Sequence, residues 1–181
     1  MNHYNFHKRF RAVYDRALAS FNKGAKDAAS LLDAADAAFL ESIGGSAQAM
    51  FDYAEDAASY DGEPDFETAL MIEAARRDYF LTIQNGELSK RVLDESTLPA
   101  KTETVRGIEW LPRIIPKARA KLHGELPASL MFCCAGDRKF FKEHDIHPAE
   151  FLRTVWACED DTDKLADWVG RRSKAAAAVG A

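Results

Sequence analysis

Apolar residues recur at intervals of three and four along much of this chain, and this spacing constrains the fold more than any other feature. It is clearest in the first segment, where one face of a helix would carry Phe6, Phe10, Val13, Tyr14, Ala17, Leu18 and Phe21. Alanine is abundant while valine and isoleucine are sparse, and this balance favours helix over strand. No window alternates apolar and polar residues for long enough to predict a strand. We therefore expect an all-α fold.

Three further helices are predicted in the first half of the chain. One covers residues 27–45, although Asp33 could also end it and start a separate helix. Ser46 is expected to cap the next helix, and Asp65 the one after it, which covers residues 66–84. That last helix is apolar most of the way round, so we expect it to be central and buried.

The middle of the chain interrupts this pattern. Residues 86–106 lose the helical spacing, are polar and contain Pro99, so we expect an extended connection there. A helix is then predicted from Trp110 to Leu122, with Pro112 in its first turn, where a missing N–H costs nothing. Pro116 inside a helix would cost ~3 kcal/mol, so the helix could instead begin near Pro116.

Three more helices are predicted after this one. Asp137 is expected to cap a helix over residues 138–145, and His147 followed by Pro148 is typical of a helix start. Asp161 or Thr162 would cap the last helix.

The predicted architecture is a helical bundle of about eight helices in two packed halves. The expected divisions are an N-terminal helical unit (1–86), an extended connection (87–106), a C-terminal helical domain (107–173) and a frayed tail (174–181).

Composition limits the classes of protein to consider. The 181 residues are 47% hydrophobic and 29% charged, which is ordinary for a globular protein. A net charge of −5 gives no general attraction for nucleic acid, whose phosphates require a basic surface. No stretch approaches the roughly 18 consecutive apolar residues of a membrane span, and no apolar run follows the basic N-terminus as in a signal peptide. We therefore expect a cytoplasmic protein with no membrane partner.

The cysteines and histidines do not form a recognisable site. Three cysteines, two of them adjacent, fit neither a disulfide framework nor zinc-binding spacing, so we expect reduced thiols and no cofactor. Cys133 and Cys134 could pair with a histidine as a nucleophile, but they are more typical of a core. His144, His147 and Glu150 could bind a metal, although a capping role for His147 explains the pattern better.

A row of basic residues is the first candidate site. Arg113, Lys117 and Lys121 are spaced four residues apart, so a helix would place them in one row. Residues 101–123 carry six basic and two acidic side chains, although the whole chain is acidic. The row could bind a phosphorylated ligand or an acidic partner. Alternatively, it is a face that the helix leaves in solvent, partly paired to the acidic N-terminal half.

A pair of arginines is the second candidate site. Arg76, Arg77 and Asp78 are consecutive in a helix that is expected to be mostly buried, so at least one charge should lie partly inside. A buried arginine needs a partner, which would be either a carboxylate that ties helices together or a bound ligand.

The second half of the chain carries a more specific pattern. The stretch WLPRIIPKARAKLHGEL is followed by DRKFFKEHDIHPAEFLRTV and then by DTDKLADWV. This order, over about residues 95–170, resembles the bacterial family catalogued as domain of unknown function 5069. Pro116 and His147 depart from the pattern of that family. The resemblance implies a small helical bacterial domain and no particular reaction, and residues 1–85 resemble no family.

We expect a non-catalytic binding or interaction module. It would present the basic helix to an acidic protein surface or a phosphorylated small molecule, or to the acidic run of residues 52–67 in a homodimer. The alternative is an enzyme with a polar pocket between the two halves, lined by Arg76, Arg77, Arg113, Cys134 and Asp137. The predicted binding residues are Arg113, Lys117, Lys121, Arg76, Arg77 and Asp137.

Overall fold

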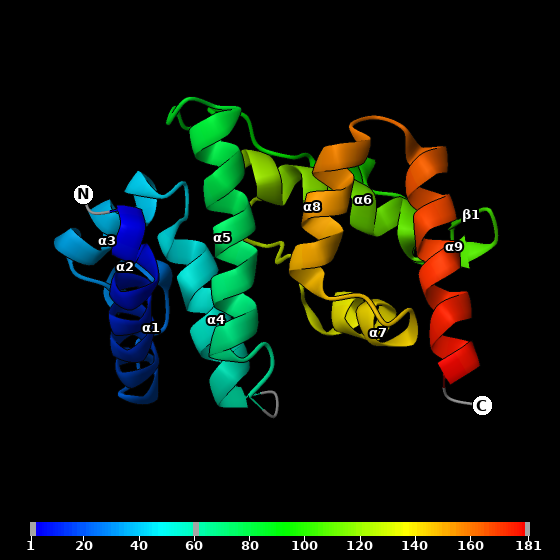
Figure 1. Ribbon diagram of the computed structural model, residues 1–181. Helices are drawn as coiled ribbons and strands as arrows, with labels where there is room; N and C mark the ends of the chain where they lie inside the picture. Colours follow the sequence, from blue (N-terminus) through cyan, green and yellow to red (C-terminus); the bar gives the residue numbers. More distant parts are fainter. Residues whose placement is uncertain (1–2, 60–61, 180–181) are drawn as a thin grey trace. The chain divides into compact units, whose positions relative to one another are not determined.

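The fold is built almost entirely from helices, so the all-α prediction is confirmed (Figure 1). The structure is a computed structural model that describes residues 3–59 and 62–179, with side chains described as far as Ser173. The chain divides into two compact units, Met1–Ser89 and Lys90–Ala181. Residues 90–106, which make up most of the predicted connection (87–106), therefore belong to the second unit.

The first unit contains a short 3₁₀ turn, η1 (His3–Asn5), and five helices. These are α1 (Phe6–Asn22), α2 (Ala28–Leu31), α3 (Ala34–Ser42), α4 (Ala47–Ser59) and α5 (Phe66–Thr82). Asp33 separates α2 from α3, because its side chain accepts a hydrogen bond from the Asp36 N–H at 2.8 Å. Of the two alternatives for residues 27–45, the separate helix is therefore the correct one.

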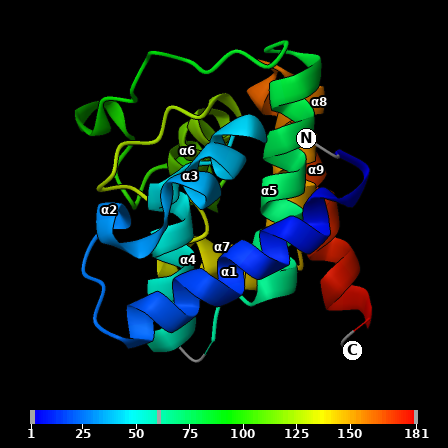
Figure 2. The same ribbon diagram turned by 90° about the vertical axis from the view of Figure 1, so that its left-hand side faces the viewer.

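Local capping and one apolar face organise this unit. Ser46 and Asp65 cap α4 and α5 as predicted, by accepting from the Ala49 and Thr68 N–H groups. The predicted stripe of α1 is also confirmed, since Phe10 and Val13 are fully buried. Figure 2 shows α1 running across α4 and α5, against which this stripe packs.

The second unit contains four helices, a 3₁₀ turn and a minimal sheet. The elements are η2 (Glu95–Thr97), β1 (Thr104–Val105), β2 (Ile108–Glu109), α6 (Leu111–His123), α7 (Ala135–Glu143), α8 (Pro148–Cys158) and α9 (Thr162–Val179). Thr104 pairs with Glu109 and Val105 with Ile108 in an antiparallel hairpin. Arg106 and Gly107 form its two-residue loop, and both have positive φ, as a type I′ turn requires. The expectation of no strand is therefore wrong here.

The start of α6 decides between the two predicted alternatives. Helix α6 begins at Leu111, with Pro112 in its first turn, as in the prediction of a helix from Trp110 to Leu122, and Pro116 lies inside it. Helix α9 continues to Val179, beyond residue 174, where the frayed tail was predicted to begin. Its run of alanines explains the difference, because alanine has the highest intrinsic helix propensity.

Aromatic rings form the core of the second unit. Phe141 lies 5.8 Å from Phe132 and 5.5 Å from Phe151, measured between ring centroids, in edge-to-face arrangements. Helices α8 and α9 run antiparallel beside each other, and α8 also packs on α6 (Figure 1). Within the described residues, no helix is long and apolar enough to cross a membrane.

Candidate functional site

The predicted basic row on α6 does not face solvent. Lys117 is only 2% exposed and Lys121 only 7% exposed. Arg113 is half-buried and donates to the Pro99 carbonyl oxygen at 2.8 Å. The expectation that the helix leaves these charges outside is therefore wrong. The reason is that α6 lies inside the unit. Helix α8 packs on it, the Pro99 carbonyl oxygen accepts from Arg113, and the Leu93 N–H donates to the Glu125 carbonyl oxygen just after the helix.

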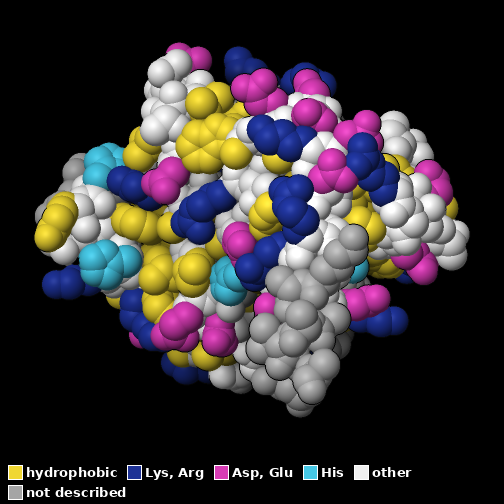
Figure 3. All heavy atoms as spheres, turned by 45° about the vertical axis from the view of Figure 1, so that its right-hand side comes forward, with side chains coloured by type: hydrophobic (Ala, Val, Ile, Leu, Met, Phe, Trp, Pro, Cys, Tyr) yellow, Lys and Arg dark blue, Asp and Glu magenta, His cyan; other side chains and the backbone are white. Residues whose placement is uncertain are grey.

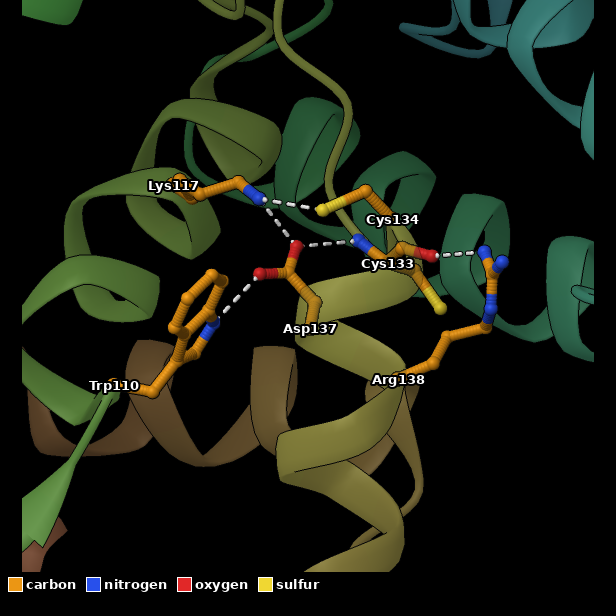
Figure 4. Close-up of polar contacts among 6 residues, drawn as sticks. All are labelled: Trp110, Lys117, Cys133, Cys134, Asp137 and Arg138. Carbon is orange, nitrogen blue, oxygen red and sulfur yellow. Dashed lines mark hydrogen bonds and ion pairs between the residues drawn. The ribbon is translucent and has the colours of Figure 1, made fainter. Parts of the chain in front are cut away.

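Lys117 instead forms a buried ion pair with Asp137 of α7. The Lys117 Nζ lies 2.5 Å from Asp137 Oδ2, and the Asp137 side chain is fully buried (Figure 4). Asp137 was predicted to cap α7, but Cys134 is the N-cap residue and Asp137 lies within the first turn. Its side chain reaches back toward Cys133, directly before the helix, and two further donors besides Lys117 are directed at it.

The two other donors come from residues with unusual backbone conformations. The Trp110 indole N–H donates to Asp137 Oδ1 at 3.0 Å, and the Cys133 backbone N–H donates to Oδ2 at 2.9 Å. Trp110 and Cys133 both have positive φ, of 68° and 72°, which is uncommon for residues other than glycine. Three donors on one carboxylate satisfy a buried charge that would otherwise be costly.

A glycine allows Trp110 to approach α7. A Cβ atom built on Gly136 would lie only 2.6 Å from an atom of the Trp110 ring. The indole therefore packs directly on the helix backbone, one residue before the carboxylate to which it donates. No sequence pattern indicates this contact, because Trp110 and Gly136 are far apart along the chain.

Cys134 adds a sulfur to this cluster. Its Sγ lies 3.4 Å from the Lys117 Nζ and is within hydrogen-bonding range (Figure 4). The same ammonium forms the ion pair with Asp137, which compensates its charge. Together these contacts fasten α6, α7 and the Cys133–Cys134 turn to one another.

Arg76 and Arg77 lie in the first unit, whereas the other predicted residues lie in the second. Arg76 is 1% exposed, which confirms that one charge of this stretch is buried. Its guanidinium donates to the Gln84 side chain at 2.6 Å and lies over the Phe80 ring. Arg77 pairs with Asp78 and lies over the Phe6 ring.

The histidine pattern near α8 is explained by local structure. The His147 Nδ1 accepts from the Ala149 N–H at 3.1 Å and caps α8, with Pro148 in the first turn, as predicted. The His144 Nδ1 lies 2.6 Å from the Ser173 hydroxyl of α9. Burial lowers the pKa of His144, with the charge of Glu143 acting in the opposite direction. Among the described residues, no group of three or more His, Cys, Asp or Glu side chains could hold a metal ion.

A groove between α8 and α9 is the candidate site that the sequence did not suggest. It has a volume of about 370 Å³ and is lined from both helices, notably by Glu150, Arg153, Thr154, Lys164, Trp168 and Arg171. The three basic side chains are exposed, whereas Trp168 is half-buried. Figure 3 turns the α9 side of the structure toward the viewer and shows several Lys and Arg side chains close together, with acidic and hydrophobic side chains among them.

The basic side chains of this groove, unlike the other arginines of the described residues, have no partner within that part of the protein. Among the described residues, Arg153 and Arg171 are the arginines that make no hydrogen bond, ion pair or ring contact, and the Lys164 ammonium makes none either. By contrast, Arg16 pairs with Asp36 and Arg106 with Asp163 and Asp167. The groove is therefore lined by basic side chains that form no polar contact within the described part of the protein.

Helical spacing was the signal that could have found this groove. Lys164, Trp168 and Arg171 are separated by four and three residues and share one face of α9. Glu150, Arg153 and Thr154 likewise share one face of α8. The basic residues of α6 form a denser row in the sequence, whereas those of the groove are divided between two helices.

Comparison with known proteins identifies a family and no characterised relative. The model of the family described as "Domain of unknown function (DUF5069)" matches residues 79–179, which is more than half of the chain. The match includes all of α6, α7 and α8, and all of α9, and therefore both the buried cluster and the groove. No curated protein and no solved structure matches the chain.

Proposed function

We propose that this chain, which belongs to the DUF5069 family, is a binding module that holds an anionic ligand in the groove between α8 and α9. This keeps the kind of function expected from the sequence but moves it from α6 to another pair of helices. The observation that carries the proposal is that the arginines without a partner among the described residues, Arg153 and Arg171, both line this one groove.

Electrostatics and size both support this proposal. The positive charges of Arg153 and Arg171 repel each other. An anion bound between them would offset this repulsion and accept charge-assisted hydrogen bonds from both guanidinium groups. Arginine is well suited to this because its planar guanidinium can donate two parallel hydrogen bonds to a carboxylate or phosphate. The groove volume of about 370 Å³ lies within the range of small-molecule sites.

The test is isothermal titration calorimetry of the full chain with inorganic pyrophosphate as the probe. We expect the double variant Arg153→Gln/Arg171→Gln to bind pyrophosphate at least about tenfold more weakly than the wild type, since each charged hydrogen bond contributes measurably. The matched control is Lys101→Gln/Lys139→Gln, which removes the same total charge from exposed residues outside the groove. If the control loses as much affinity as the groove variant, or if the wild type binds no pyrophosphate, the proposal is wrong.

A further inference from the structure

We infer that the ligand of this groove is a small planar ring that carries a phosphate, of which a nucleoside monophosphate is the simplest example. The ring would lie on Trp168, and the phosphate would lie between Arg153 and Arg171. This inference rests on the proposed function and names the class of ligand for the same groove.

The antiparallel arrangement of α8 and α9 orders the lining residues along the groove. Arg172 of α9 lies 3.6 Å from Glu150 of α8, which fixes the register at one end. Because both helices rise by about 1.5 Å per residue, Trp168 is level with Thr154, and Lys164 is level with Cys158. Arg153 and Arg171 therefore lie toward the same end, with Trp168 next to them and Lys164 beyond it.

Trp168 provides a fixed aromatic surface in the middle of the groove. Its ring is half-buried and lies 6.5 Å from the Phe151 ring of the core, measured between centroids. Ala157 and Cys158 line the groove beside it, so the floor is mainly apolar. A tryptophan held in place by the core is a suitable platform for a flat ring, because stacking requires no reordering of the side chain.

The charges around this floor suit a single anionic group at one end. Arg171 follows Trp168 by three residues on the same face of α9, and Arg153 reaches the groove from α8. The only acidic residue of the lining, Glu150, pairs with Arg172, which also pairs with Asp145. Glu150 is therefore already engaged with a cation, and the two guanidinium groups of Arg153 and Arg171 are available to hold a phosphate.

The dimensions favour a small molecule over an acidic peptide. Lys164 and Arg171 are seven residues apart on α9, which separates them by about 10 Å along the helix axis. The aromatic surface of Trp168 and one phosphate position occupy this distance along α9. An acidic peptide would extend further and would need more basic side chains along the groove. An anion without an apolar part could bind the two arginines but would leave Trp168 unused, so a ligand with both a ring and a phosphate fits the groove better.

The experiment measures the affinity of the full chain, by isothermal titration calorimetry, for adenosine monophosphate, ribose 5-phosphate and adenosine. We expect adenosine monophosphate to bind at least about tenfold more tightly than either fragment, because only it uses both the ring and the phosphate position. Trp168→Leu should weaken its binding by roughly five- to a hundredfold and leave ribose 5-phosphate unchanged, since stacking on an aromatic side chain contributes on this scale. Trp168→Phe should retain most of the affinity.

The outcomes separate this inference from the proposed function. Suppose that pyrophosphate binds through Arg153 and Arg171 but ribose 5-phosphate binds as tightly as adenosine monophosphate. The proposed anion-binding function is then correct, and the inference that the ligand carries a planar ring is wrong. Binding of an acidic peptide with no affinity for adenosine monophosphate would also overturn the inference alone. If no anion binds through the two arginines, both proposals fail. The comparison of the three ligands uses the wild type, so it remains decisive even if Trp168→Leu does not fold.

Discussion

At the scale of single residues, the second unit is organised around one buried carboxylate. Asp137 receives hydrogen bonds from Lys117, Trp110 and the Cys133 N–H, and two of these residues adopt left-handed backbone conformations. Each such conformation costs on the order of 1–3 kcal/mol, so it persists only where surrounding contacts require it. The contacts to Asp137 are the evident requirement, which explains why a lysine lies inside this unit.

The first prediction concerns this ion pair. Lys117→Met keeps the length of the side chain but leaves the Asp137 charge buried without its cation, so we expect the free energy of unfolding to fall by about 3–5 kcal/mol. The matched control is Lys139→Met on the exposed surface of α7, which should change it by less than about 0.5 kcal/mol. Urea denaturation measures both, and equal effects of the two substitutions would show that the pair contributes no specific stability.

The second prediction concerns His144 and pH. Because burial lowers the pKa of His144 in the folded protein, the unfolded chain binds its proton first as the pH falls. The stability that the neutral ring contributes is therefore present above the ordinary histidine pKa of about 6.5 and is lost as the pH falls through the lowered value. We expect the loss of unfolding free energy between about pH 7.5 and pH 5 to be smaller in His144→Asn than in the wild type.

Urea denaturation at the two pH values measures this difference. The two proteins differ only at residue 144, so the comparison isolates His144. An identical loss in both proteins would mean that the ring near Ser173 is as accessible to protons as in the unfolded chain.

At the scale of elements, the sequence predicted best those features that a few neighbouring residues determine. The caps at Ser46, Asp65 and His147 were predictable because a short side chain bonds to the backbone two or three residues away. Pro116 left two possible starts for α6, and the earlier one is correct because the local cost of this proline does not prevent a helix that packing stabilises. Local propensity likewise gave no warning of the hairpin at Arg106–Gly107, which has only two residues in each strand.

The candidate sites were harder to predict because they depend on packing. Lys117 was expected outside since lysine is rarely buried, and its partner Asp137 lies twenty residues further along the chain. The groove requires the register of α8 against α9, which the spacing within one helix does not contain. Only after the helices are paired do Arg153 and Arg171 line the same groove.

The third prediction compares two glycines in helices. Alanine is normally the better helix former by about 0.5–1 kcal/mol, so Gly170→Ala on α9 should stabilise the protein by that amount, because nothing lies within 4 Å of its new Cβ. Gly136→Ala on α7 should instead destabilise it by about 1–3 kcal/mol, since the Cβ would overlap the Trp110 ring. Urea denaturation measures the change in unfolding free energy for each substitution. Changes of opposite sign would confirm the contact between Gly136 and Trp110, and stabilisation by both substitutions would disprove it.

At the scale of the whole molecule, two boundaries can be compared. The family match begins at residue 79, within α5, whereas the second compact unit begins at Lys90. The unit from Lys90 onward contains a complete aromatic core around Phe141 and the whole Asp137 cluster. The structural boundary therefore marks the part of the chain that should fold by itself.

The last prediction follows from this boundary. We expect the fragment 90–181 to unfold cooperatively in urea, and Lys117→Met to destabilise it by as much as it destabilises the full chain, because the residues around that pair all lie within the fragment. The fragment 79–181 serves as the control, since it adds only residues assigned to the first unit. Equal stability of the two fragments would support the boundary at Lys90. A fragment 90–181 that does not fold, beside a fragment 79–181 that does, would instead place the boundary where the family match begins.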